Sequence, residues 1–155
     1  MTTTLWTTHV KASPEAVFAE VSDLANHAKW SEKTYKAKKT SEGPVAVGTT
    51  YDSWGWLPPK GKEYLNHVTI TAFEPGKRFA FDAADPRGPV IPSVFTLTPE
   101  GDGTKVERTM DFGKPIGING LMWPIIFPRL VRPAVQRNLD MFRDVVEKGQ
   151  ARPSA

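Results

Sequence analysis

The fold is decided by residues 130–148, which read LVRPAVQRNLDMFRDVVEK. Apolar residues recur in this stretch every three or four positions, and charged residues occupy the other side. The apolar residues are Val131, Val135, Leu139, Phe142 and Val146. This spacing predicts one long amphipathic helix, with Pro133 tolerated near its first turn and Gly149 as its end.

Residues 34–112 show the period of strands instead. Alternating apolar and polar runs are separated by turn signals such as Glu74-Pro75-Gly76 and Gly101-Asp102-Gly103. The expected strands are Tyr35–Thr40, Thr49–Leu57, Lys62–Phe73, Arg78–Ala83, Ser93–Thr98 and Thr104–Phe112. A turn is expected at Pro58–Gly61 and a loop at Asp85–Pro92.

The chain begins with one more strand and two short helices. Leu5–Ala12 alternates like a strand, and Ser13-Pro14-Glu15 has the residues of a helix start. Asp23 begins a second short helix.

These elements predict an α+β protein, with a curved antiparallel sheet of seven strands and a long helix across it. A helix of about eighteen residues is roughly 27 Å long, enough to cross the sheet diagonally. An antiparallel sheet has one face that must be covered. A single helix on a wide curved sheet leaves a hollow, which is the usual form of a small-molecule site.

The composition indicates one domain, expected over residues 1–149, with a flexible tail at 150–155. The chain has 155 residues, 39% of them hydrophobic, which is enough for a core. It has no cysteine, which excludes disulfides, thiolate zinc sites and cysteine nucleophiles. The first residues lack a charged lead and a long apolar core, so no signal peptide is expected and a cytoplasmic location is favoured. The uncharged run Pro115–Pro128 is too short to span a bilayer.

The net charge of +3 is only mildly basic. Its densest basic run is Lys33, Lys36, Lys38 and Lys39, on a strand expected near a sheet edge. Lysines there block edge-to-edge pairing. No nucleic-acid-binding motif accompanies them, so no nucleic-acid partner is expected.

Several short segments, taken in order, carry a resemblance to a known family. They are Ala12–Phe18 (ASPEAVF), Val21–Ser31 (VSDLANHAKWS), Val47–Tyr51, Phe73–Phe79, Phe95–Pro99 leading into Gly103–Val106, and Asn138-Leu139. With these segments the chain resembles the START-like (SRPBCC) superfamily, in particular its polyketide cyclase/dehydrase-type branch. The resemblance covers nearly the whole chain. It implies the helix-grip fold and a hydrophobic ligand held between sheet and long helix, and it transfers no catalytic residue.

Arg108 is the most informative single residue. It shares a strand face with Val106, Met110 and Phe112, the side expected to look toward the helix. An unpaired buried guanidinium is costly, so a partner is required. The functional interpretation is an anchor for a carboxylate, enol or phenolate of a ligand. The alternatives are a salt bridge to a protein carboxylate, or a strand-end arginine that reaches water.

Further ligand-binding candidates follow from the same alternation. Tyr64 and Asn66 share one face of the long strand, and a tyrosine hydroxyl there would hold an oxyanion or satisfy a backbone carbonyl. The face of Thr49–Leu57 that turns inward is ambiguous, because a bulge would exchange Tyr51 and Ser53 for Trp54 and Trp56. The complete candidate set is Arg108, Tyr64, Asn66, Tyr51, Phe79, Phe81, Phe95, Met110, Phe112, Trp123, Val135, Leu139 and Phe142.

The three histidines suggest neither metal binding nor a catalytic triad. His9, His27 and His67 have no metal-ligand spacing, and no cofactor is implied. We expect His27, on a short helix, to be a surface or cap residue. No nucleophile elbow is present.

Residues 116–130 are unusually apolar, with Ile118, Leu121, Met122 and Ile125 among them. The wider stretch Gly113–Arg129 is expected as a loop plus irregular helix. Residues 116–130 either close one end of the core or form a mobile lid. Contact with a membrane, which nearby arginines would assist, is a less favoured alternative.

The sequence therefore favours binding of a hydrophobic, aromatic or polycyclic small molecule in the cavity between sheet and helix. The alternatives are a polyketide aromatase/cyclase or dehydratase using the same cavity, and a lipid carrier. The chain is expected as a monomer or homodimer.

Overall fold

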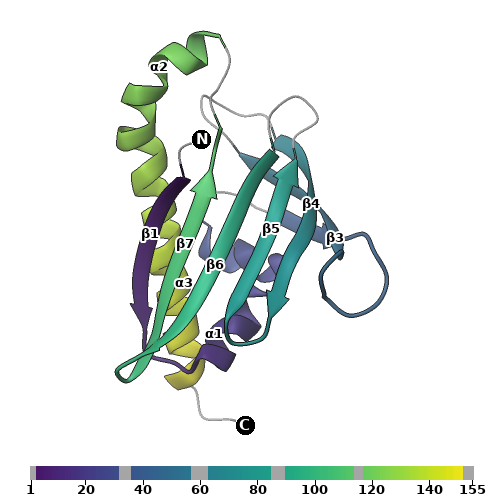
Figure 1. Cartoon of the computed structure of the whole chain (residues 1–155), viewed down its shortest axis with the longest axis vertical. Coiled ribbons are helices and arrows are strands. Elements are labelled where there is room, and N and C mark those ends of the chain that lie inside the picture. The colour runs from purple at the N-terminus through teal and green to yellow at the C-terminus, as the bar shows by residue number, and fades with distance from the viewer. Residues whose placement is uncertain (1–2, 32–35, 57–62, 85–89, 114–116, 152–155) are drawn as a thin grey trace.

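The computed structural model describes residues 3–31, 36–56, 63–84, 90–113 and 117–151. Within these residues the chain forms one seven-stranded antiparallel sheet with helices packed on one face (Figure 1). The strands are β1 (Thr3–Val10), β2 (Lys36–Lys39), β3 (Thr50–Trp56), β4 (Glu63–Glu74), β5 (Arg78–Ala84), β6 (Val90–Glu100) and β7 (Gly103–Asp111). The helices are α1 (Pro14–Val21), η1 (Leu24–Trp30), α2 (Ile118–Ile126), η2 (Phe127–Val131) and α3 (Arg132–Ala151). The predicted α+β architecture is confirmed.

The sheet order is β1-β7-β6-β5-β4-β3-β2, so the first strand pairs with the last. We call the face covered by α1, η1 and α3 the inner face. The register places Trp6 opposite Arg108 and Arg108 opposite Phe95. Because cross-strand partners point to the same side, these three residues form a row across the inner face.

β6 is longer at both ends than the alternation predicted, and it ends at Glu100 rather than Thr98. β6 begins at Val90 rather than Ser93, because Val90, Ile91 and Pro92 pair with the end of β5. Of the expected loop at Asp85–Pro92, residues 90–92 are thus strand, and residues 85–89 lie outside the described residues. The expected turn at Pro58–Gly61 also lies outside them.

The two short helices begin where capping residues were expected. The Ser13 hydroxyl accepts a hydrogen bond from the Ala16 amide at 3.2 Å, and Pro14 occupies the first turn of α1. The Asp23 carboxylate accepts from the Ala25 amide at 3.0 Å and caps η1. Each cap satisfies an amide that the helix itself leaves without a partner. The second helix is a 3₁₀ helix, a difference that affects the site.

The apolar segment 118–131 is helical and runs directly into α3. The sequence predicted a loop plus irregular helix here, followed by a separate helix from Leu130. The Arg132 amide donates to the Phe127 carbonyl, five residues back, so η2 is a widened π turn. Proline lacks an amide hydrogen and crowds the carbonyl four residues before it. The widened turn accommodates Pro128 and Pro133 without ending the helix.

The helix also continues past its expected end. Gly149 was predicted to stop it, and this was wrong, because α3 extends to Ala151. Nothing lies within 4 Å of the position that a Gly149 side chain would occupy. Glycine inside an exposed last turn weakens a helix by roughly 1 kcal/mol without breaking it.

Three helices share the inner face, although the sequence analysis gave its coverage to one. α3 packs along β1 and against η1, whereas α1 packs on β5, β6 and β7, and η1 lies next to β2. The Trp6 indole donates to the Arg132 carbonyl at 3.0 Å and ties β1 to the start of α3. As predicted, Val135, Leu139, Phe142 and Val146 form the buried side of α3.

The lysine-rich strand is β2, at one edge of the sheet as expected. Lys36 and Lys38 are exposed there, and Lys33 lies outside the described residues. Charged side chains on an edge strand oppose pairing with another chain.

Candidate functional site

Arg108 lies on the inner face, on the second strand in the sheet order, and is only 8% exposed. Its partners across the sheet are Trp6 on β1 and Phe95 on β6. The guanidinium carbon is 4.9 Å from the centroid of the Phe95 ring, within the range of a cation–π contact. Its Nε donates to the Ser93 hydroxyl at 3.4 Å. This burial excludes the alternative of a strand-end arginine that reaches water.

His27 is buried beside this group, so its prediction as a surface or cap residue was wrong. Only 5% of it is exposed. A 3₁₀ helix repeats every three residues, so Leu24, His27 and Trp30 lie in line and all three are buried. The sequence carried one signal for this burial. Leu24 lies three positions before His27, and Trp30 lies three positions after it.

The geometry fixes the protonation of His27. Its Nε2 lies 2.9 Å from the Val21 carbonyl, which can only accept, so Nε2 carries the proton. The pKa of His27 is lowered to about 3, mainly by burial. The hydrogen bond to Val21 acts in the opposite direction, and the positive charge of Arg108 lowers the pKa further. At neutral pH the imidazole is uncharged and its Nδ1 holds the lone pair.

Aromatic rings surround the two polar residues. Phe95 has its ring centroid 6.1 Å from that of His27, 6.3 Å from Trp30 and 6.5 Å from Phe142. The Phe81 ring centroid is 6.0 Å from that of His27. The site thus joins η1, β5, β6, β7 and α3.

The Trp30 side chain adds a buried donor. Its ring centroid is 4.2 Å from that of His27 and 5.0 Å from that of Phe142. The indole Nε1 is buried and donates to no oxygen or nitrogen within the part of the chain that the structure describes. A buried donor left without an acceptor costs about 1 to 3 kcal/mol.

Most of the predicted lining residues lie on this inner face. Arg108, Phe79, Phe81 and Phe95 lie around His27. Phe142, Val135 and Leu139 are buried on α3. Tyr51 and Ser53 are buried and Trp54 is half-buried, which indicates the inward face of β3. Asn66 and Met110 are half-buried. The side chain of Tyr64 lies outside what the structure describes.

Phe112 and Trp123 form a separate cluster at the end of β7, away from Arg108. Their ring centroids are 6.0 Å apart, and each also contacts Phe127. Trp6 contacts both Phe112 and Phe127, at 6.5 Å in each case. Because Trp6 is also the neighbour of Arg108, it connects this cluster to the site.

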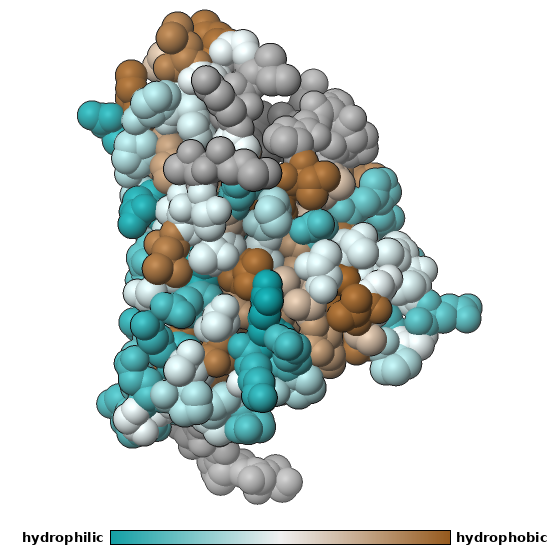
Figure 2. Space-filling model, viewed as in Figure 1, coloured by the Kyte–Doolittle hydropathy of each residue, from teal (hydrophilic) through white to brown (hydrophobic). Residues whose placement is uncertain are grey.

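The outer side of α2 is exposed. Figure 2 shows hydrophobic residues gathered over it at the top of the molecule. The described residues include no group of histidine, aspartate and glutamate that could hold a metal ion. None of their helices is long and apolar enough to cross a membrane.

Comparison with known proteins gives one family. Residues 1–147 match the family described as polyketide cyclase/dehydrase and lipid transport. No curated protein matches the chain.

Several solved structures have the same fold. Protein TTHA0849 of Thermus thermophilus superposes with a TM-score of 0.77 at 17% identity, covering 96% of this chain and 99% of that one. Protein CV1439 of Chromobacterium violaceum gives 0.72 at 19% identity, covering 94% and 96%. Protein SA2116 of Staphylococcus aureus, described as of unknown function, gives 0.72 at 13% identity, covering 97% and 96%. At these identities the likeness concerns the fold alone.

Proposed function

The chain belongs to the polyketide cyclase/dehydrase and lipid transport family, and from this membership we propose that it binds a hydrophobic, aromatic or polycyclic small molecule between the sheet and α3. The apolar body of the ligand packs against the aromatic residues of the inner face. Its polar group, a carboxylate, enol or phenolate, lies at Arg108. Binding, rather than chemistry, is the function that these residues support best.

One observation carries the proposal, namely a guanidinium buried on an aromatic face. Arg108 stacks on Phe95 and is held by Ser93, so it is fixed in position before any ligand arrives. Hydrogen bonds to charged groups contribute about 1.5 to 3 kcal/mol, more than neutral ones. A guanidinium positioned on an aromatic face therefore favours an anionic or strongly accepting group of a ligand.

The neutral state of His27 also bears on the charge of the ligand. Since its imidazole is neutral, it adds no second positive charge beside Arg108. The Trp30 indole offers a further donor for a neutral acceptor atom of the ligand.

The alternative of a cyclase or dehydratase is less well supported. Closing a ring from a poly-ketone chain requires a base that removes a proton from carbon and a group that stabilises the enolate. Arg108 could stabilise an enolate. His27 is a poor base, because its pKa of about 3 lies far below the neutral value that general-base catalysis favours. An anion bound to Arg108 would reduce the effect of the Arg108 charge on the pKa of His27. Burial, the larger cause of the lowered pKa, would remain.

The proposal is tested by comparing two fluorescent probes of similar shape. The anionic probe is 1-anilinonaphthalene-8-sulfonate, and the uncharged one is N-phenyl-1-naphthylamine. We expect both to bind with increased fluorescence. Arg108→Met should lower the affinity for the anionic probe roughly 10- to 100-fold, because one charged hydrogen bond is lost. The affinity for the neutral probe should change little.

Lys105→Met is the matched control, because Lys105 is on the same strand, half-buried, and pairs with Glu107 at 3.1 Å. It should leave both affinities unchanged. Equal affinities of folded Arg108→Met and the unmodified protein for the anionic probe would remove Arg108 as the anchor. Failure of both probes to bind the unmodified protein would contradict the binding function itself.

A further inference from the structure

The helix α2 presents an apolar face to solvent. Ile118, Leu121, Met122 and Ile125 are 77%, 79%, 40% and 49% exposed. Their spacing of three and four residues places them on one side of the helix. We call these four residues the α2 face. Single exposed apolar residues are ordinary, but a contiguous exposed group on one helix indicates an interaction surface.

The opposite side of α2 is already engaged. Trp123 packs against Phe112, and both rings contact Phe127 at the start of η2. Trp6 on β1 contacts Phe127 and holds this cluster on the sheet. The inner side of α2 is thus anchored to the sheet. The α2 face takes no part in this anchoring.

The charged residues that follow α2 are basic up to Leu139, whereas Asp111, which precedes it, is buried and its carboxylate accepts from the Gly113 amide at 2.9 Å. Residues 112–139 contain Lys114, Arg129, Arg132 and Arg137 and no aspartate or glutamate. Arg129 lies at the end of the α2 face, where its guanidinium is 3.4 Å from the Ile125 carbonyl. Arg129 and Arg132 are both exposed. An exposed apolar face next to two exposed arginines complements a negatively charged apolar medium.

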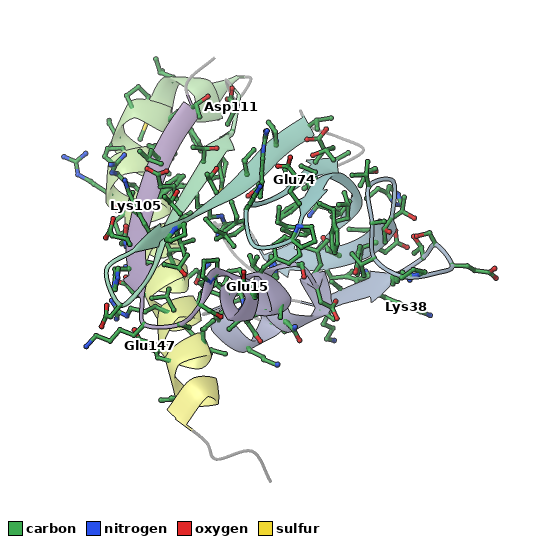
Figure 3. The ribbon with its side chains drawn as sticks, turned by 60° about the horizontal axis from the view of Figure 1, so that its bottom comes forward. Glu15, Lys38, Glu74, Lys105, Asp111 and Glu147 are labelled. Carbon is green, nitrogen blue, oxygen red and sulfur yellow. The ribbon has the colours of Figure 1, made fainter. Side chains whose placement is uncertain are left out.

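The position of α2 permits contact with a broad surface. It lies at one end of the molecule, beyond the sheet (Figure 1). Figure 3 shows Asp111 at this end, where β7 leads toward α2, and Lys38 at the far edge of the sheet. Nothing in the described residues extends past α2 at this end in Figure 1.

We propose that the α2 face docks on the surface of an anionic lipid bilayer. The four apolar side chains enter the boundary between headgroups and acyl chains, and Arg129 and Arg132 contact lipid phosphates. The helix lies in the interface plane, as amphipathic helices with a basic border do. This surface is separate from Arg108, and the proposal does not depend on the proposed ligand.

A second copy of the chain fits this face less well. In a two-fold symmetric contact the same patch meets itself, so the arginines of both copies would be brought together. Residues 112–139 offer no carboxylate to pair with them. The anionic bilayer supplies the missing negative charge.

The test is sedimentation with vesicles of 30% phosphatidylserine in phosphatidylcholine and with vesicles of phosphatidylcholine alone. The unmodified protein should bind the anionic vesicles, and 0.5 M salt should weaken binding. Leu121→Ser with Ile125→Ser should reduce the partition coefficient about tenfold or more. Arg129→Gln with Arg132→Gln should reduce it roughly 25-fold, about fivefold for each charge.

Matched controls use exposed residues elsewhere. Leu5→Ser with Val47→Ser removes exposed apolar side chains, and Lys36→Gln with Lys38→Gln removes two charges from β2. Both should bind as the unmodified protein does. Circular dichroism establishes that each variant is folded.

Three results would overturn the proposal. They are no binding to the anionic vesicles at low salt, binding that is equal on neutral vesicles, and binding that the α2 substitutions leave unchanged. Sedimentation velocity tests whether a second copy of the chain occupies the α2 face instead. A dimer that Leu121→Ser with Ile125→Ser dissociates would assign the face to a second copy instead.

Discussion

His27 is a neutral base held inside an aromatic cluster, and its state links stability to pH. In the unfolded chain a histidine has a pKa near 6.5, whereas in the folded protein the pKa of His27 is about 3. Between these values the unfolded state binds a proton that the folded state does not. The free energy of unfolding contributed by this difference is fully present above about pH 6.5 and is lost as the pH falls toward 3.

We therefore predict that acid destabilises the protein partly through His27. At pH 4.5 this contribution should cost about 2 to 3 kcal/mol relative to pH 7. In His27→Gln, whose amide can still donate to Val21, the fall in the urea midpoint between pH 7 and 4.5 should be correspondingly smaller. His9→Gln is the control, because His9 is only partly buried.

Nuclear magnetic resonance gives a second measurement on the unmodified protein. The His27 ring should show no titration above pH 4 and should carry its proton on Nε2. A ring that titrates near pH 6 would contradict this assignment. An unchanged pH slope in folded His27→Gln would contradict the stability prediction.

The contrast between Arg108 and His27 shows what single residues reveal in a sequence. The inward position of Arg108 could be predicted because a charge interrupts an apolar strand face. The alternation of a strand has a fixed period of two residues. The position of His27 depends on whether its helix turns every 3.0 or every 3.6 residues, which the sequence of seven residues does not determine. Ser93 and Trp30 joined the site only through packing between distant segments.

At the scale of elements, the β6–β7 hairpin contains a glycine required by close approach. A Cβ on Gly103 would lie 2.0 Å from the Val10 carbonyl oxygen and 2.9 Å from its carbon. These are backbone atoms of β1, which pairs with β7 at this end. The end of β1 and the hairpin therefore fit together only without a side chain at position 103.

We predict that Gly103→Ala destabilises the protein by about 3 kcal/mol or more, measured by urea unfolding, because the backbone of β1 must shift. Gly101→Ala is the matched control in the same hairpin. Its φ of +57° makes alanine unfavourable by about 1 to 2 kcal/mol, but nothing lies within 4 Å. Equal losses in the two variants would contradict the steric explanation.

Element types were predictable where one period dominates. The sheet, its hairpins and the buried side of α3 follow from alternation and helical spacing. The segment 118–131 was not predicted as a regular helix, because proline at positions 124 and 128 disfavours a helix interior on local propensity alone. Its helical form depends on a π turn and on the contacts of Trp123 with Phe112, which are tertiary effects.

At the scale of the whole molecule, Phe142 joins three elements of the core. It is fully buried on α3, and its ring centroid is 5.0 Å from that of Trp30 on η1 and 6.5 Å from that of Phe95 on β6. We predict that Phe142→Ala lowers the free energy of unfolding by about 3 to 5 kcal/mol, as buried phenylalanines do. That is a large part of the total stability of a domain of this size.

Met141→Ala serves as the comparison, because Met141 is adjacent in α3 but only half-buried. Its effect on the urea midpoint should be clearly smaller. If both substitutions lower the free energy of unfolding equally, Phe142 would not hold η1, β6 and α3 together as described.

The pairing of β1 with β7 also determines where the two ends of the chain lie. Thr3 is opposite Asp111, on the side of the sheet where α2 begins, whereas Ala151 ends α3 at the opposite pole (Figure 1). An affinity tag fused ahead of β1 would crowd α2, while one fused after α3 would project from the distant pole. Capture on a biosensor chip through a C-terminal tag would therefore present α2 to the flowing analyte, and capture through the other end would obstruct it.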